Sequence, residues 1–120
     1  MQCPQCKETL FRKEVADRLN VCPHCQHHFK VSARERIRQL LDPDSFEEWH
    51  TDVLPLDPLG FVDNVPYAER LKATQKKTGM ADAAIVGKGF VRGRPVVLGI
   101  TDFSFMAGSM GSVVGEKLTR

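Results

Sequence analysis

Four cysteines, all in the first quarter of the chain, are the residues best suited to chemistry. They form a Cys-x2-Cys-x15-Cys-x2-Cys array made of Cys3, Cys6, Cys22 and Cys25. Each pair lets two thiolates from one turn reach the same ion, and the separation between the pairs lies within the range of zinc sites. Two disulfides or two redox motifs are the alternatives, but no secretory segment precedes the cysteines and a redox motif needs no duplicate. The array predicts one structural zinc ion in a closed shell of four thiolates.

Three histidines close to the array are alternative metal ligands. Because four thiolates already complete a tetrahedral shell, we expect surface or supporting roles for His24, His27 and His28.

A run of small residues near the carboxyl end of the chain is the second candidate site. Residues 103–115 read FSFMAGSMGSVVG, between an expected strand and an expected helix. Such a segment exposes backbone N–H groups at the positive end of the helix, and glycine lets a phosphate or carbonyl approach them. The pattern is neither a Walker loop nor a dinucleotide fingerprint, and a close-packed turn explains it at least as well. Asp102 is the one acid near this turn, and a capping or turn role suits it equally.

The cysteines must be positioned by a zinc ribbon over residues 1–30. We expect a strand around Thr9–Phe11, a return strand around Asn20–Val21, and a knuckle beside each. So short a segment buries little apolar surface, so the metal must supply most of its folding energy. The residues expected to cover the site and form its small core are Leu10, Phe11, Val15, Leu19, Val21 and Phe29.

A helix follows the ribbon. The sequence Ser32-Ala33-Arg34-Glu35 predicts a capping box, in which Ser32 caps the first turn and Glu35 reaches back. Asp42-Pro43 ends this helix. The helical face expected to point inward consists of Ala33, Ile37, Leu40 and Leu41.

The rest of the chain predicts a further helix, a hairpin and a last helix. Residues 46–49 read as a short helical turn, and 52–65 as an irregular connector. Pro66 and Gly79 delimit a helix over 67–78. The β-rich runs 83–91 and 95–103, joined by 92–94, predict a hairpin, and residues 113–118 a helix.

Composition and charge narrow the class of protein. Hydrophobic residues make up 42% and charged residues 27%, which is typical of a globular chain rather than a disordered one. The first 41 residues carry eight Lys or Arg against four acids, whereas residues 42–63 carry seven acids and no Lys or Arg. This asymmetry favours an anionic partner for the first third, although a solvated charged face explains it equally. The longest apolar runs are too short to cross a bilayer, and the cysteine usage favours a reducing cytoplasm.

Taken in order, these segments closely resemble the amino-terminal part of the β subunit of bacterial and plastid acetyl-CoA carboxylase carboxyltransferase. The zinc knuckles alone are generic, but their combination with the sequence GSMGSVVG over 108–115 is highly specific. Ala107 stands where some relatives carry glycine. The resemblance covers essentially all 120 residues and is carried by Cys3–Cys6, Val21–His28, Ser32–Arg36, Tyr67–Leu71, Gln75–Gly79 and Phe105–Glu116.

The resemblance implies a small zinc ribbon followed by the start of an α/β crotonase-like (ClpP/crotonase spiral) domain. We expect the ribbon over 1–30, a helical connector over 31–81, and the first hairpin and helix of the carboxyltransferase domain over 82–120. Members of this family pair with an α subunit and transfer a carboxyl group from carboxybiotin to acetyl-CoA. The product is malonyl-CoA for fatty acid biosynthesis.

The resemblance also implies where the chemistry takes place. Acetyl-CoA and biotin both pass through enolates, whose negative oxygens preorganised N–H groups can stabilise. The residues placed on the acyl-CoA side are Gly108, Ser109, Gly111 and Ser112. Biotin on its carrier protein is the carboxyl donor, and the partners are the α subunit, the biotin carboxyl carrier protein, biotin carboxylase and acetyl-CoA, with no membrane. The family's later glycine-rich turns have no counterpart before Arg120, so we expect a truncated chain that is inactive alone, with catalytic residues beyond Arg120.

Two other functions remain open. A zinc-ribbon nucleic-acid-binding module would use the basic helix of Arg34, Arg36 and Arg38 for phosphates, and Phe11 or Phe29 for stacking. A purely structural ribbon would serve as a docking surface for the α subunit.

Overall fold

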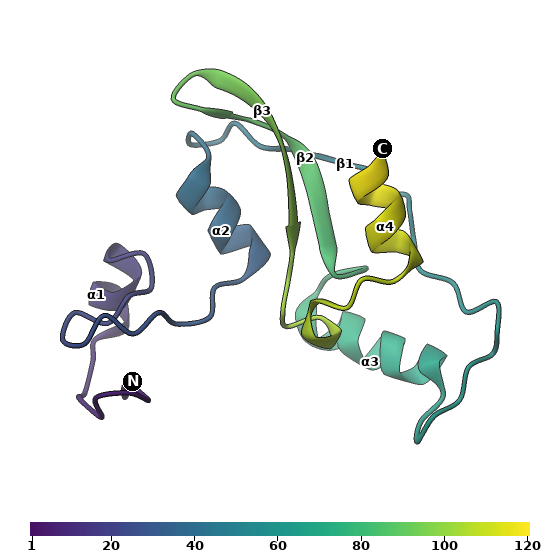
Figure 1. The fold of residues 1–120 in the computed structure, drawn as a ribbon, viewed down its shortest axis with the longest axis horizontal. Coiled ribbons are helices and arrows are strands. Elements are labelled where there is room, and N and C mark those ends of the chain that lie inside the picture. The colour runs from purple at the N-terminus through teal and green to yellow at the C-terminus, as the bar shows by residue number, and fades with distance from the viewer. The chain divides into compact units, whose positions relative to one another are not determined.

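The computed structural model describes residues 1–120, which form two compact units, Met1–Val31 and Ser32–Arg120 (Figure 1). The first contains α1 (Arg12–Asp17). The second contains, in chain order, α2 (Ala33–Leu40), β1 (Glu47–Trp49), α3 (Tyr67–Thr78), β2 (Ala84–Val91), β3 (Arg94–Thr101), a 3-10 turn (Met106–Gly108) and α4 (Ser112–Thr119). None of the helices is long and apolar enough to cross a membrane.

The first unit is built from two knuckles with the same backbone. In one, the Lys7 N–H donates to the Cys3 carbonyl, and in the other the Gln26 N–H donates to the Cys22 carbonyl, both at 3.0 Å. Lys7 and Gln26 also share a left-handed conformation, with φ of 63° and 62°. The two Cys-x2-Cys pairs therefore share the same backbone geometry.

The strands expected in the ribbon are wrong. The pairings there are the single bridges Gln2–Thr9 and Val21–His28, and α1 lies between the knuckles. Single bridges suffice because each knuckle closes its own turn, so neither needs a longer ladder.

The core of the first unit is smaller than expected. Leu10 and Val15 are buried with Cys3 and Cys22, and Phe29 packs against them. Phe11 and Leu19, which were expected inside, are 78% and 60% exposed. Phe11 is the N-cap of α1 and Leu19 has a φ of 56° just after that helix, so both lie where the chain changes direction.

The second unit is organised around an antiparallel sheet in the order β1-β2-β3. The hairpin expected from the sequence is present, with Val91 opposite Arg94 and a turn at Arg92-Gly93. Both turn residues have positive φ, 50° and 76°, as a two-residue hairpin turn with the right-handed twist of its strands requires.

The expected helical turn at 46–49 is wrong, because this segment forms β1. Trp49 lies opposite Val86 of β2, so the edge of a long strand supplies partners that a short helix would lack. Ser45, two residues before β1, accepts a hydrogen bond from the Phe90 N–H at 3.1 Å. Packing is close here, since a Cβ on Gly87 would lie 2.1 Å from the Glu47 carbonyl oxygen.

The helices α2 and α3 begin where the sequence predicts and α3 also ends there, whereas α2 ends at Leu40, before the expected stop at Asp42-Pro43. Ser32 Oγ accepts from the Glu35 N–H at 3.2 Å, but the Glu35 carboxylate accepts from Arg38 at 2.6 Å instead of reaching back. Gly79 ends α3 with a φ of 69°. Leu40, expected to point inward, is 46% exposed, because the chain leaves the helix at Leu41 and buries that side chain in its place.

The sheet separates two hydrophobic clusters. Adjacent residues of β2 point to opposite faces, so Ile85 packs with Ile37 of α2, whereas Ala84 packs with Val114 of α4. The second cluster also contains Phe105, directly before the glycine-rich segment. The core therefore fixes the start of that segment and the helix that follows it.

Candidate zinc centre and glycine turn

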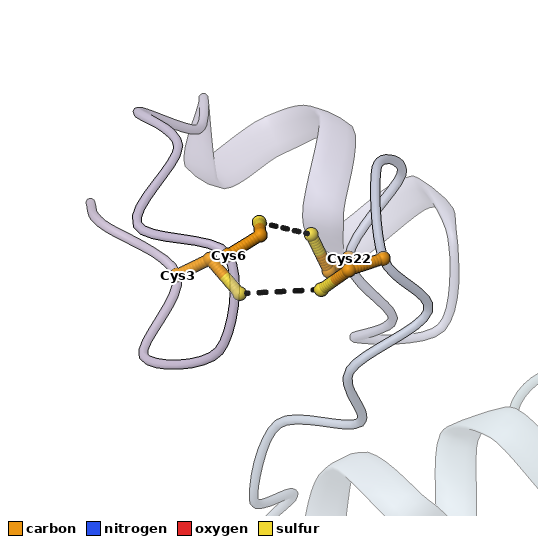
Figure 2. Close-up of side chains that lie close together, drawn as sticks. Cys3, Cys6 and Cys22 are labelled. Carbon is orange, nitrogen blue, oxygen red and sulfur yellow. Dashed lines mark hydrogen bonds between the residues drawn. The ribbon is translucent and has the colours of Figure 1, made fainter.

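The four cysteine sulfurs lie together at the meeting point of the two knuckles. Each knuckle contributes two thiols, and Cys3 faces Cys25 while Cys6 faces Cys22, with Sγ–Sγ distances of 3.7 and 3.8 Å (Figure 2). All four sulfurs lie within 4.8 Å of one another. Sequence reasoning brought these four residues together correctly, from spacing alone.

The spacing of the sulfurs fits a zinc ion. With Zn–S bonds of about 2.3 Å, the edge of a regular tetrahedron is about 3.8 Å. The two facing pairs already have this separation. Little rearrangement is therefore needed to bind the ion, and a shell of four sulfurs leaves no position for a reacting water.

One thiol of each knuckle is prepared for ionisation. Burial opposes ionisation of Cys3, but the N–H groups of Cys6 and Gln5 outweigh it and lower the pKa of this thiol to about 7. Burial likewise opposes ionisation of Cys22, and the N–H groups of Cys25 and His24 lower its pKa. Since the thiolate is the form that binds metal, these backbone donors favour ionisation of one thiol in each knuckle, whereas the pKa of the other thiol, Cys6 or Cys25, is raised.

The neighbouring histidines lie outside the sulfur cluster. The cluster that could hold a metal consists of the four cysteines. The His27 ring contacts the Phe29 ring edge-on, with centroids 5.1 Å apart. His27 therefore extends the small core rather than the metal shell.

The glycine-rich segment contains an unusual backbone turn. Met106, Ala107 and Gly108 have successive positive φ values of 44°, 57° and 73°. For Met106 and Ala107 this left-handed conformation costs about 1–2 kcal/mol each. Two hydrogen bonds close the turn, from the Gly108 N–H to Phe105 and from the Ser109 N–H to Met106.

The four residues expected on the acyl-CoA side are only partly brought together. Ser109 and Gly111 line a hollow of about 460 Å³, next to Tyr67 and Arg70 of α3. Gly111 is also the N-cap of α4, so the free N–H groups of the first helical turn begin at this point. Gly108 and Ser112 are not among the residues that line the hollow.

Asp102 serves both as a cap and as a turn residue, the two roles that the sequence left open. Its side chain is 3% exposed. One carboxylate oxygen accepts from the Ala33 N–H of α2 at 2.7 Å, and the other accepts from Ser104 N–H at 2.9 Å and Ser104 Oγ at 2.6 Å. Burial alone would raise the pKa of Asp102, but the bonds from Ser104 and Ala33 outweigh it and lower the pKa.

Two further buried charges were not singled out from the sequence. Lys117 of α4 is 4% exposed and donates to the Ala84 carbonyl at 3.4 Å. Asp82, 8% exposed, borders the same hollow as Ser109, and burial raises its pKa even though the charge of Lys117 acts in the opposite direction. The available signal was weak: Lys117 lies four residues after Val113 and so falls on the apolar face of α4.

Comparisons with known proteins agree with both parts of the chain. Residues 1–25 match the family described as the acetyl-CoA carboxylase zinc finger domain. A solved structure of transcarboxylase 12S, with methylmalonyl-coenzyme A and methylmalonic acid bound, is 33% identical and superposes with a TM-score of 0.54. The superposed region covers 74% of this chain and 15% of the transcarboxylase chain.

Curated relatives extend the match over nearly the whole chain. The acetyl-coenzyme A carboxylase carboxyl transferase subunit beta of Rhodopirellula baltica is 54% identical over 99% of this chain and 38% of the relative. The same subunit of Synechococcus elongatus is 50% identical over 99% of this chain and 39% of the relative. The chain therefore spans about two fifths of the length of these relatives.

The fold and the site together define a zinc ribbon followed by the start of an α/β crotonase-like domain, which confirms the expected fold class. In sequence, the chain is similar over 99% of its length to acetyl-CoA carboxylase carboxyltransferase β subunits, the family that its motifs resemble. The expected structural zinc is supported by the zinc finger family and by the four gathered thiols. The comparisons do not favour a separate nucleic-acid-binding module.

Proposed function

We propose that the chain acts within a carboxyltransferase that moves a carboxyl group from carboxybiotin, held on a carrier protein, to acetyl-CoA. The products are malonyl-CoA and uncarboxylated biotin, which stays attached to its carrier protein. The observation that supports this most strongly is the match to carboxyltransferase β subunits over 99% of the chain. The cellular role is the supply of malonyl-CoA for fatty acid biosynthesis in the cytoplasm.

The zinc ribbon has a structural part in this function. Cys3, Cys6, Cys22 and Cys25 would hold one zinc ion, and the ion supplies folding energy to a unit with a small core. Because four thiolates close the shell, no step of carboxyl transfer passes through it.

The proposed role of the glycine-rich segment is to contact the substrate. Its hollow beside Ser109 and Gly111 accommodates part of an acyl-CoA, and the N–H groups at the start of α4 face a developing negative charge favourably. Gly108 and Ser112 do not line the hollow, and their proposed part is to form the turn and the first residue of α4 on either side of Ser109 and Gly111. No side chain of residues 1–120 is assigned to proton transfer.

The partners proposed are those that the family resemblance implies. Carboxybiotin must be delivered by a biotin carboxyl carrier protein loaded by biotin carboxylase, and an α subunit completes the site with the second enolate-binding half. The units proposed are the ribbon over 1–30, the connector over 31–81 and the opening hairpin and helix over 82–120.

Turnover measurements test the proposal. The complete gene product, mixed with α subunit, acetyl-CoA and carboxylated carrier protein, is expected to produce malonyl-CoA. The 120-residue chain under the same conditions is expected to produce none. Absence of malonyl-CoA from the complete product would refute the assigned reaction, and its appearance with the short chain would refute the need for further residues.

A further inference from the structure

Asp102 is the most connected buried acid near the glycine turn, and carboxyl transfer as proposed makes no use of it. Its backbone N–H donates to the Ala83 carbonyl at 2.8 Å, just before β2. Its carboxylate accepts from Ala33 on α2 and from Ser104 on the turn. Asp102 thus forms hydrogen bonds with the first residue of α2, with the residue before β2 and with the start of the glycine-rich segment.

The turn that follows Asp102 has an unfavourable backbone conformation, so other residues must stabilise it. Met106 and Ala107 adopt a left-handed backbone that non-glycine residues rarely take, and such conformations persist only where the surrounding structure imposes them. The anchor point is Phe105, whose side chain is 2% exposed and whose N–H donates to the Asp102 carbonyl at 3.1 Å. From there the turn depends on its own bonds at Gly108 and Ser109.

We propose that Asp102 is a positioning residue for the carboxyltransferase site: by binding Ala33 and Ser104 at once, its carboxylate imposes the left-handed turn 106–108 that presents Ser109 and Gly111 to the ligand. Asp102 does not touch substrate. The relevance of the turn to substrate rests on the proposed function, whereas the coupling between Asp102 and the turn does not.

Two other interpretations of the same bonds make different predictions. If Asp102 only capped α2, its loss would loosen α2 and leave the turn unchanged. Ser32 provides the comparison, because its Oγ accepts from the Glu35 N–H in the same helical turn but has no bond to the glycine segment. If Asp102 were merely a buried stabilising residue, its loss would loosen all elements alike.

Amide hydrogen exchange on the 120-residue chain separates these cases. In Asp102→Asn, the amide NH₂ cannot accept a hydrogen bond, so one of the two acceptor positions is lost. We expect exchange at Gly108 and Ser109 to accelerate about ten- to a hundredfold relative to the amides of α3. Ser32→Ala should accelerate exchange in α2 and leave Gly108 and Ser109 unchanged.

Two further variants keep the test decisive if Asp102→Asn folds poorly. Ser104→Ala removes one donor to the carboxylate, and exchange at Gly108 and Ser109 should rise about two- to tenfold. Ala107→Gly removes the left-handed strain, and in the Ser104→Ala background it should restore protection by about fivefold. If Asp102 only capped α2, Ser104→Ala would cause no loss of protection at Gly108 and Ser109 for Ala107→Gly to restore.

Unchanged exchange at Gly108 and Ser109 in both Asp102→Asn and Ser104→Ala, or an equal effect of Ser32→Ala there, would overturn the assignment. A second measurement links the turn to substrate: in the complete subunit with α subunit, Ser104→Ala should raise KM for acetyl-CoA more than KM for the carboxybiotin donor. If the wild-type complex makes no malonyl-CoA, the proposed reaction fails while the exchange result stands by itself.

Discussion

Removal of zinc should unfold the first unit of the chain and leave the second folded. Fully buried aliphatic side chains in Met1–Val31 are confined to Leu10 and Val15. Each contributes about 1.5–3 kcal/mol, so together they supply roughly 3–6 kcal/mol. A structural zinc ion contributes about 10–16 kcal/mol in small zinc-finger peptides at neutral pH. The metal is therefore the larger stabilising contribution, and without it the unit should not remain folded.

The measurement is backbone NMR of the 120-residue chain before and after a strong zinc chelator. We expect the amide signals of residues 1–31 to collapse to random-coil positions, while the signals of β2 and β3 keep their dispersion. Zinc should restore the first set with one equivalent of metal. Cys22→Ser should behave like the chelated protein, whereas His24→Ala, one residue from a ligand of the same knuckle, should retain the metal.

Persistence of dispersed signals from residues 1–31 after complete metal removal would refute this reasoning. It would mean that the knuckle hydrogen bonds and the small core suffice alone. Loss of both units together would refute the independence of the second unit.

Three further predictions concern the second unit. Gly87→Ala should lower the free energy of unfolding, measured by urea titration, by about 3 kcal/mol, because the new methyl group would lie 2.1 Å from a backbone oxygen. The matched control Gly115→Ala has open space and a helical backbone, so it should raise the free energy of unfolding by about 1 kcal/mol. Ala107→Gly should stabilise by about 1 kcal/mol by relieving the left-handed turn, and an unchanged urea midpoint would contradict this. Since the pKa of Asp102 in the folded protein lies below its ordinary value of 3.8, the stability it contributes is present above pH 3.8 and is lost as the pH falls through the folded pKa. The melting temperature of wild type should therefore fall more steeply below about pH 4 than that of Asp102→Asn.

Elements with strong local signals were predictable from the sequence. Pro66 and Gly79 delimit α3 because one sets φ for the first turn and the other adopts the left-handed conformation that ends a helix. The sulfur cluster was equally predictable, since thiolates two residues apart share a turn and so share an ion. In both cases the physical cause lies within a few residues.

Elements defined by distant partners were not predictable. β1 has three residues, and their local pattern suggested a helix until the edge of β2 supplied hydrogen bonds. Phe11 was assigned to the core on hydrophobicity, but α1 turns it outward. Asp102 could not be assigned between two roles because its main partner, Ala33, lies 69 residues earlier.

That separation has a consequence for the synthesis of the protein. At about 5–20 residues per second, a ribosome delivers Asp102 roughly 3–14 seconds after Ala33. During this interval α2 has the Ser32 cap but lacks its second acceptor, and the apolar side of Ile37 lacks the strand that will cover it. During this interval the zinc-binding unit of the nascent chain is already complete, whereas α2 still lacks the strand and the acceptor that stabilise it. A chaperone would be most useful at this stage.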